Sequence, residues 1–260
     1  MNHPISFTKM HGLGNDFVIL NNLKNTITLD KSLIVPWANR HTGIGFDQLL
    51  MIEPGKKGDF FCKIFNADGS EATQCGNGLR CVARYIQEEK LHADSTLTLE
   101  TKAGIYPITI QDFDHITVMM GAPEIQERLI ELADLPVSIL SIGNPHAIIK
   151  VESLHFPNAK EMADSISSNN YFTDGANIGF MHIVSPQHIR LRTFERGSGE
   201  THACGSNACA ASVAGIINGW LQHSVTVEFP YGELSVNWDE EKQTIMMTGP
   251  ASKVFEGKIS

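Results

Sequence analysis

The stretch FERGSGETHACGSNACAAS, residues 194–212, places a cysteine after a glycine-rich turn and directly before a run of small and apolar residues. Such a run is typical of a buried, closely packed helix. An earlier stretch, FNADGSEATQCGNGLRCVARY, residues 65–85, has the same plan. Each runs from Phe to Glu, then to Cys-Gly, and then into a helical pattern with a further cysteine. We therefore interpret the two stretches as corresponding parts of two similar halves.

An internal repeat of about half the chain length extends this match along the whole sequence. The two stretches are 129 residues apart up to Cys75 and Cys204, and 128 apart at Cys81 and Cys209. One duplication, rather than a solenoid of many repeats, explains a period this long. The other aligned positions are Gly14-Asn15 with Gly143-Asn144, Ile19 with Ile148, Gln48 with Asn177, Phe65 with Phe194, Glu71 with Glu200, Gly76 with Gly205, Thr98 with Thr226, Glu100 with Glu228, Gly104 with Gly232, and Gly121 with Gly249.

The hydrophobic pattern predicts a mixed α/β (α+β) chain of two pseudo-symmetric halves. We place them at 1–124, carrying Cys75, and 125–260, carrying Cys204, with the last ten or so residues packing back on the first half. The segment 122–136 is the expected seam. Helices are expected at 77–90 and 205–218, the second ending before Gly219, and at 32–41 and 158–167. Strands are expected at 17–20, 48–53, 60–65, 96–100, 106–110, 116–120, 147–151, 178–184, 189–194, 225–229, 233–238 and 244–247.

The composition excludes several classes of protein. The 260 residues are 42% hydrophobic, so a sizeable core is available. The net charge is −9 and basic runs are lacking, which argues against nucleic acid or an anionic membrane as partner. The sequence contains no apolar run long enough for a membrane span and no export signal pattern near its start. Five cysteines, an odd number, favour a reduced, cytoplasmic setting over a disulfide framework.

The paired cysteines suggest proton transfer. Cys75 and Cys204 each precede a predicted helix, whose free N–H groups and dipole bind anions and lower the pKa of a thiol. If the two halves meet about a pseudo-twofold axis, two sulfurs face one small ligand. A thiolate can then remove a proton next to a carboxylate while a thiol delivers one to the opposite face, inverting the carbon without a metal or organic cofactor.

Five segments of the chain resemble the diaminopimelate epimerase family, in order and over nearly the whole length: GLGNDF, FNADGSEATQCGNGLRC, GNPH, ANIGF and ERGSGETHACGSNACAA. The resemblance implies two halves that each wrap a mainly antiparallel sheet round a central helix, with the active site in the cleft between them. It implies a cofactor-independent isomerase that interconverts LL- and meso-2,6-diaminopimelate in lysine and peptidoglycan precursor synthesis, and a homodimer. No metal is expected.

The same resemblance assigns roles to individual residues. It makes Cys75 and Cys204 the acid–base pair, and His146 and Glu195 the groups that orient or activate the thiols, with Glu195 also touching substrate. The remaining substrate contacts are of three kinds: backbone N–H donors to the reacting carboxylate from Gly76, Asn77, Gly205 and Ser206; the lining of the reacting end from Asn15 and Gln48; and the distant amino-acid end held by Asn66, Asn144, Asn177 and Arg196.

The repeat adds an argument about the substrate. Arg196 aligns with Ala67, and Glu195 with Asn66, so the thiols are paired but the arginine is single. A substrate attacked from two faces, with one further carboxylate to one side, requires this pattern. A bidentate arginine–carboxylate contact would select such a tail.

Three features depart from the family pattern. Asn207 stands where the family often has Gly, and Ala147 where Cys is common. The stretch between Gly121 and Gly143 is shorter than usual, which alters the central connection.

Other interpretations stay open at this stage. The cysteines could be buried filler, a redox pair that joins on oxidation, or zinc ligands, although gaps of six and five residues do not suit zinc. The chain could also be a proline or hydroxyproline racemase, a relative of the phenazine-biosynthesis isomerases, or a binding module that has lost turnover.

Overall fold

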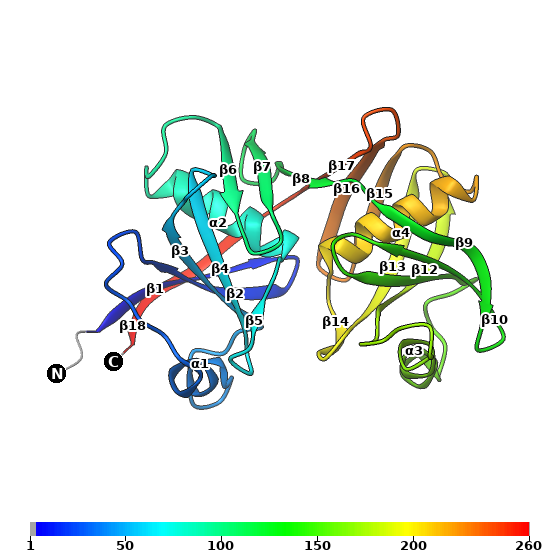
Figure 1. Ribbon diagram of the computed structural model, residues 1–260, viewed down its shortest axis with the longest axis horizontal. Helices are drawn as coiled ribbons and strands as arrows, with labels where there is room; N and C mark the ends of the chain where they lie inside the picture. Colours follow the sequence, from blue (N-terminus) through cyan, green and yellow to red (C-terminus); the bar gives the residue numbers. More distant parts are fainter. Residues whose placement is uncertain (1–3, 260) are drawn as a thin grey trace. The chain divides into compact units, whose positions relative to one another are not determined.

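The computed structural model describes residues 4–259, and its contacts divide the chain into two compact units. Unit 1 comprises residues up to Val118 together with the C-terminal residues from Gly249, and unit 2 comprises Met119–Thr248. Strand β8 leads out of unit 1 and strand β17 leads back to it (Figure 1). No helix in the described range is long and apolar enough to cross a membrane.

Unit 1 consists of a curved sheet with one helix inside it and one outside. The sheet order is β18-β1-β2-β3-β4-β6-β7-β8, with β5 added to β4. Neighbouring strands are antiparallel except for β2 with β3 and β4 with β6. The elements are β1 (Ile5–Gly12), β2 (Asn15–Asn21), α1 (Lys31–Ala38), β3 (Gln48–Pro54), β4 (Phe60–Asn66), β5 (Glu71–Ala72), α2 (Gly76–Glu88), β6 (Thr96–Glu100), β7 (Ile105–Ile110), β8 (Ile116–Gly121) and β18 (Ser252–Ile259).

Unit 2 repeats this arrangement. Its sheet order is β9-β10-β11-β12-β13-β15-β16-β17, with β14 added to β13, and β11 with β12 and β13 with β15 are the parallel pairs. The elements are β9 (Glu124–Leu132), β10 (Leu135–Ser141), β11 (Pro145–Lys150), α3 (Ala159–Ser167), β12 (Asn177–Ser185), β13 (His188–Glu195), β14 (Gly199–Thr201), α4 (Gly205–Ile217), β15 (Ser224–Phe229), β16 (Gly232–Asp239) and β17 (Thr244–Gly249).

The ladders of the two units share one register, which confirms the repeat. Leu49 pairs with Phe65 in unit 1, and the positions 129 residues later, Ile178 and Phe194, pair in unit 2. Gln48 likewise pairs with Phe17, as Asn177 pairs with His146. The predicted fold class, two pseudo-symmetric halves with a mainly antiparallel sheet round a helix, is confirmed.

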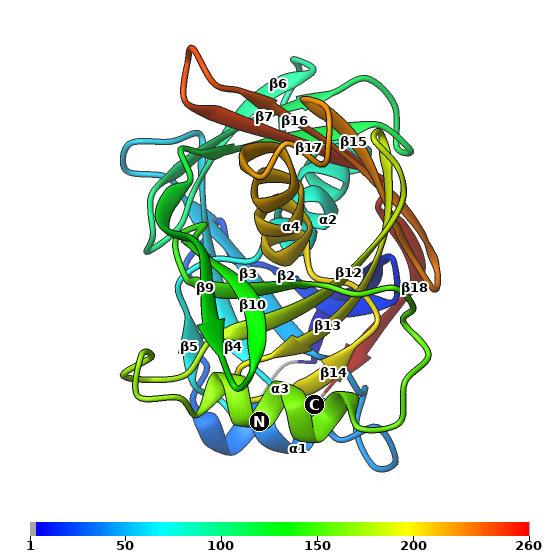
Figure 2. The same cartoon turned by 90° about the vertical axis from the view of Figure 1, so that its right-hand side faces the viewer.

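The central strands read as continuous apolar runs because both of their faces are covered. Leu50 in β3 lies against Gly78 of α2, whereas its neighbours Leu49 and Met51 belong to the cluster beneath α1. In unit 2, α4 contacts β10, β11, β12, β13, β15 and β16, and Figure 2 shows these strands around it. The first twelve residues of α4 are all buried, as its small side chains predict, and Gly219 ends the helix region with φ of 72°.

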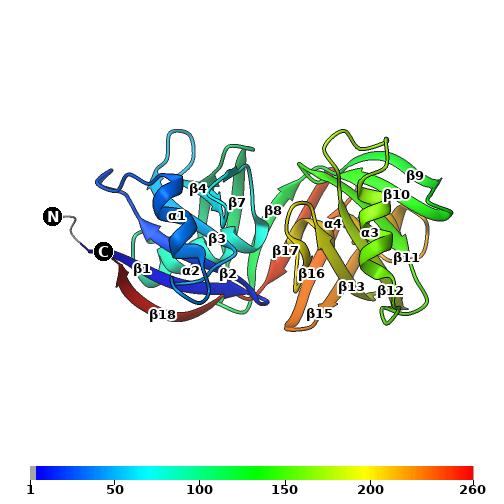
Figure 3. The ribbon, with the colours of Figure 1, turned by 90° about the horizontal axis from the view of Figure 1, so that it is seen from below.

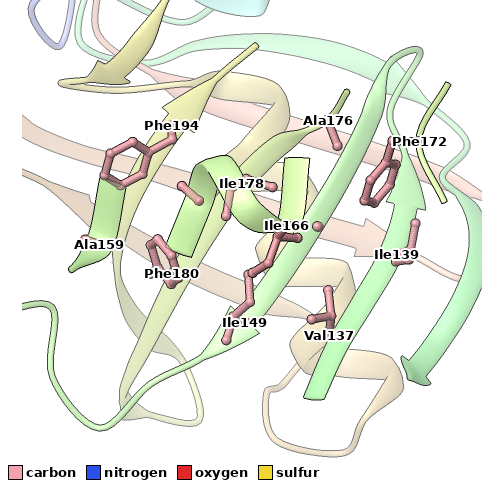
Figure 4. Packing of buried hydrophobic residues seen from close by; sticks show 12 residues of the cluster. Val137, Ile139, Ile149, Ala159, Ile166, Phe172, Ala176, Ile178, Phe180 and Phe194 are labelled. Atoms are coloured by element: carbon pink, nitrogen blue, oxygen red, sulfur yellow. The ribbon is translucent and has the colours of Figure 1, made fainter. Parts of the chain in front are cut away.

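A second helix covers the outer face of each sheet (Figure 3). In unit 2 the α3 side chains Ala159, Ala163 and Ile166 pack on β10, β11, β12 and β13 (Figure 4). In unit 1 Ile34 and Trp37 of α1 have the same role. The helices predicted at 32–41 and 158–167 are therefore present and amphipathic, and their buried faces hold the strand ends that carry the candidate site.

The segment 122–136, which we expect to be the seam between the halves, contains strand β9 and the turn into β10. Leu132 pairs with Leu135, and the two intervening residues, Ala133 and Asp134, have φ of 50° and 60°. Two successive positive φ values are typical of the tight turn that joins twisted antiparallel strands. Most of β9 is exposed, so its sequence lacks the apolar alternation by which a strand is recognised.

The turn at Ala133 offers a test of this hairpin. An alanine at positive φ is strained, so Ala133→Gly should raise the free energy of unfolding by about 0.5–1 kcal/mol. The control is Ala93→Gly, at an exposed alanine without positive φ, which should lower it. Urea denaturation measures both, and a destabilised Ala133→Gly variant would contradict the turn.

Candidate active site

Cys75 lies at the start of α2 and is its N-cap residue. Its backbone is extended, and its Sγ accepts a hydrogen bond from the backbone N–H of Gly78 at 3.4 Å. Gly76 and Asn77 form the first, buried turn. The first N–H groups of a helix lack partners within the helix and lie at its positive end. This end of α2 is therefore suited to an anion, either a thiolate or a carboxylate.

Asn15 is held beside Cys75 from two sides. Its Oδ1 lies 4.0 Å from the Cys75 Sγ and accepts a hydrogen bond from Asn77 Nδ2 at 3.3 Å. Its Nδ2 donates to Asp47 Oδ2 at 2.9 Å. Because both ends of the amide are engaged, its orientation next to the sulfur is fixed.

Gln48 and Asn66 lie opposite each other, at the start of β3 and the end of β4. Gln48 Nε2 donates to Asn66 Oδ1 at 2.9 Å, and Asn66 Nδ2 donates to Ser70 Oγ at 3.0 Å. Since Gln48 is also paired with Phe17, two residues from Asn15, the strand ends gather these amides at one edge of unit 1.

Sequence reasoning missed Arg80, which supports this cluster from within. Arg80 is completely buried in α2, and its Nη2 donates to Asn77 Oδ1 at 3.0 Å. Its Nε donates to the carbonyl of Pro250 at 3.2 Å. The signal was present in the motif CGNGLRC, but only the packed structure shows that the arginine lies inside the unit and not on the helix surface.

Cys204 is the equivalent N-cap of α4 in unit 2 and is buried. Its Sγ lies 3.4 Å from the hydroxyl of Ser206, in the first turn with Gly205. Burial raises the pKa of the Cys204 thiol well above its usual value, and the negative charge of Glu195 raises it further. Hydrogen bonds from Ser206 and the Asn207 backbone lower this pKa but do not compensate. The expectation that the helix start favours thiolate is therefore wrong for Cys204, because desolvation outweighs the dipole.

Glu195 is fixed where it meets Cys204. It is the last residue of β13, and its Oε1 accepts a hydrogen bond from Thr201 Oγ1 at 2.6 Å. The hairpin between β13 and β14 pairs Glu195 with Gly199 and turns through Gly197 at φ of 80°, a value that favours glycine. The glycines of ERGSGE thus shape the turn that brings the carboxylate to the thiol.

His146 lies fully buried in β11, next to Asn177 in the parallel ladder. Its Nε2 is 3.0 Å from Asn144 Oδ1. Burial lowers the pKa of His146 to about 3, an effect that a hydrogen bond with the Asn207 side chain opposes. The imidazole is therefore neutral at physiological pH, and it offers one hydrogen-bond donor and one acceptor but no resting positive charge.

Arg196 follows Glu195 directly and is exposed. Its backbone N–H donates to Asn177 Oδ1 at 2.9 Å, and its guanidinium reaches the Asp174 carbonyl at 3.4 Å. Within residues 4–259 no carboxylate pairs with this guanidinium. The charge is accordingly available to an anionic ligand.

A possible metal site lies elsewhere in unit 2. The ligand atoms of His188, Glu228 and Glu233 lie within 4.8 Å of one another. However, Arg190 Nε is 3.0 Å from the same Glu228 oxygen that faces His188, so a cation is already present. We interpret the group as an ion-pair cluster.

Asp16, in the GLGND segment, anchors the start of β2 behind Asn15. Arg40 donates two hydrogen bonds to its carboxylate, at 2.8 and 2.7 Å, and Lys9 lies 2.5 Å away. Burial acts to raise the pKa of Asp16, but the hydrogen bonds from Arg40 and Lys9 outweigh it, and the pKa is lowered to about 2. The charged form therefore stabilises the folded state.

The sign of this shift gives a pH dependence. The pKa of Asp16 rises from about 2 to 3.8 on unfolding, so its contribution is full above the unfolded value and is lost as the pH falls towards 2. Above pH 5 the free energy of unfolding of the wild type should be roughly 1–2 kcal/mol higher than that of Asp16→Asn, a value reduced because Arg40 is half-exposed. Below pH 4 this difference between the two proteins should become smaller. Exposed Asp94→Asn is the control. A gap independent of pH would exclude this ion pair as the cause.

Comparisons with known proteins agree with the geometry. The family model described as diaminopimelate epimerase matches residues 7–126 and 138–254. The diaminopimelate epimerases of Nitrosomonas europaea and Ectopseudomonas mendocina are 44% and 40% identical, each over 98% of this chain and 98% and 99% of their own lengths. A Bacillus anthracis phenazine biosynthesis protein of the PhzF family has the same fold, with a TM-score of 0.78 and 19% identity over the whole of both chains. The chain therefore belongs to the diaminopimelate epimerase family.

Proposed function

We propose that the protein interconverts LL- and meso-2,6-diaminopimelate by moving the α-proton between Cys75 and Cys204, without a cofactor. One observation carries the proposal: each unit places a cysteine as the N-cap of its enclosed helix, at equivalent positions of the repeat. The family assignment supplies the substrate. The proposal includes the approach of the two sulfurs to opposite faces of one substrate carbon.

The proton balance requires no further reactant. In one direction the Cys75 thiolate takes the α-proton and becomes a thiol, while the Cys204 thiol gives its proton to the opposite face and becomes a thiolate. The reverse direction exchanges the roles. The raised pKa of Cys204 suits it to begin as the proton donor. Glu195, which shares a hydrogen bond with Cys204, is the acceptor through which this thiol can be deprotonated when it has to act as the base.

The negative charge that develops on the reacting carboxylate needs fixed donors. The first turns of α2 and α4 supply such donors in the backbone N–H groups of Gly76 and Asn77, and of Gly205 and Ser206. Gly76 and Gly205 have no side chain that would keep a carboxylate from the helix start. Asn15 and Gln48 line the same end in the proposal, and the contacts from Asn77 and Asn66 hold their amides.

The far end of the substrate carries a second amino-acid group. Only one of the two aligned halves has an arginine at the corresponding position, so the protein offers one set of side chains for this end. We assign its carboxylate to Arg196, whose guanidinium carries no carboxylate partner within residues 4–259. Asn177 fixes the backbone of Arg196 through the 2.9 Å hydrogen bond. Asn66 and Asn144 complete the set. We further propose, on the family resemblance, a cytoplasmic homodimer.

Replacement of either cysteine tests the two-base scheme. Cys75→Ala and Cys204→Ala should each lower kcat for epimerisation by at least ~10²–10⁴-fold, since general acid–base groups contribute on this scale. The assay follows deuterium incorporation at the α-carbon and inversion from LL to meso isomer in D₂O with reduced protein.

The chain offers matched controls for these variants. Cys81 and Cys209 are fully buried inside α2 and α4, so Cys81→Ala and Cys209→Ala remove a sulfur without touching a helix start. Both should retain turnover. Normal epimerisation by a Cys75 or Cys204 variant, or turnover of proline in place of diaminopimelate by the wild type, would refute the proposal.

Arg196→Lys tests the recognition of the far carboxylate. Lysine keeps the charge but loses the two-pronged geometry, so kcat/KM for diaminopimelate should fall by about 10–100-fold, mainly through KM. The control is Arg190→Lys, in strand β13 just before Arg196 and paired with Glu228, which should leave both constants near the wild-type values. An unchanged KM in Arg196→Lys would remove Arg196 from the substrate site.

A further inference from the structure

Among the described residues of unit 2, four buried side-chain polar atoms have no conventional hydrogen-bond partner, and two of the four belong to neighbouring side chains. They are His146 Nδ1 and Asn207 Oδ1. Both side chains are completely buried. The Asn207 side chain nevertheless raises the pKa of His146, which is the effect of a hydrogen-bond acceptor facing a ring N–H. Asn207 also bonds to the carbonyl of Ile178, in the strand that pairs with β11 directly beside His146, so the geometry points to a contact between the two side chains.

Asn207 cannot turn its amide round to suit the ring. Its Nδ2 donates to the carbonyl of Ile178 at 2.9 Å, which directs Oδ1 away from that carbonyl. A neutral imidazole carries a proton on only one nitrogen. If that proton were on Nε2, Nδ1 and Asn207 Oδ1 would be two buried acceptors facing each other, an unfavourable arrangement that leaves both atoms unsatisfied.

On the other side of the ring the partner is adaptable. Asn144 Oδ1 lies 3.0 Å from Nε2, and no hydrogen bond anchors the other end of this amide among the described residues. Rotation of the Asn144 amide by half a turn presents its NH₂ group to Nε2 instead, a choice that is assigned from the network and not from atom positions. The fixed amide of Asn207 therefore sets the tautomer of His146, and the amide of Asn144, which can rotate, adapts to it.

The packing of unit 2 makes room for Asn207. A Cβ at Gly179, in the neighbouring strand, would lie 2.7 Å from Asn207 Oδ1. In unit 1 the equivalent positions are exchanged: Gly78 takes the place of Asn207 and Leu50 the place of Gly179, and a Cβ at Gly78 would lie 3.0 Å from Leu50. In unit 1 Leu50 of strand β3 fills this space, and in unit 2 Asn207 of helix α4 fills the equivalent space. Phe17 occupies the position in unit 1 that is equivalent to His146.

We propose that Asn207 is a positioning residue that holds His146 in the tautomer protonated at Nδ1, so that Nε2 is the acceptor. The tautomer itself does not depend on the proposed function. The consequence of the tautomer for catalysis does rest on the proposed function. With this tautomer Nε2 of His146 can accept a hydrogen bond, as the thiol-orienting role assigned to it requires, whereas the other tautomer presents only a donor there.

Nitrogen NMR of protein labelled with ¹⁵N-histidine tests the tautomer directly, with His146→Gln identifying the signal. In the wild type Nδ1 should have the shift of a protonated ring nitrogen and Nε2 that of an unprotonated one, unchanged from pH 6 to 8. Asn207→Ala removes the acceptor, so the proton should move wholly or partly to Nε2. Asn207→Asp restores an acceptor and should restore the wild-type pattern. A wild-type ring protonated at Nε2, or an unchanged tautomer in Asn207→Ala, would overturn the proposal.

A matched control and a second perturbation keep the test independent of stability. Ser212→Ala removes another fully buried polar side chain of α4, one that bonds only to Ala208 within the helix, and should leave the tautomer unchanged. If Asn207→Ala fails to fold, Gly179→Ala displaces the Asn207 oxygen while both partners remain, and should also shift the proton. A shift in Ser212→Ala would show a general effect of α4 packing and would count against Asn207.

The activity arm separates this inference from the proposed function. In Asn207→Ala the kcat for diaminopimelate epimerisation should fall about tenfold or more, as is common when a contact that supports a functional residue is lost. The KM should change little, and Asn207→Asp should recover the kcat. If the tautomer moves as stated but the wild type does not epimerise diaminopimelate, the proposed function fails and the assignment of Asn207 stands. A moved tautomer with unchanged kcat would refute the catalytic consequence alone.

Discussion

Each unit depends on a helix that its own sheet encloses. The first twelve residues of α4 are buried, and α2 presents a buried face from Gly76 to Ile86. The first N–H groups of such a helix have no partners within the helix, and another group must satisfy them. In both units a cysteine is the N-cap residue at this position, and in α2 its Sγ accepts a hydrogen bond from the Gly78 N–H. The proposed catalytic cysteines therefore lie where an enclosed helix leaves backbone donors without intrahelical partners.

The backbone arrangements of the two units are alike, but the side chains at some equivalent positions differ. Equivalent residues pair in the same register in both sheets, so the strand ends that carry Asn15 and Gln48 in unit 1 carry Asn144 and Asn177 in unit 2. At other equivalent positions the side chains diverge: Phe17 against His146, Asn66 against Glu195, and Ala67 against Arg196. In the proposed function the symmetric backbone provides two proton-transfer groups, and the differing side chains provide one recognition end. A substrate with one reacting centre and one distant carboxylate would match this division.

Enclosed elements with continuous apolar sequences could be predicted from the sequence. Strands β2, β3 and β12 read as apolar runs, and the small residues of α4 predict its burial. The largely buried strands β1 and β10 were not predicted, because polar residues and a proline interrupt their sequences. In contrast, β9 and β18 are edge strands with mostly exposed residues, and their patterns give no strand signal. The site residues were named from motifs, but the contacts that support them were not. Arg80 bonds to Pro250 and Asn207 bonds to Ile178, both far away in sequence, so only the packed units show these contacts.

Burial, rather than the helix dipole, sets the resting protonation states in unit 2. A helix start stabilises an anion by about 0.3–1 kcal/mol and by about 2 kcal/mol in favourable sites. Full burial can shift a pKa by up to about 3–5 units, at about 1.4 kcal/mol each, so desolvation prevails. Cys204 accordingly remains a thiol and His146 remains neutral. In the proposed function, the proton of Cys204 goes either to Glu195 or to the substrate carbon. Burial would then couple the appearance of negative charge on this sulfur to the proton transfer itself.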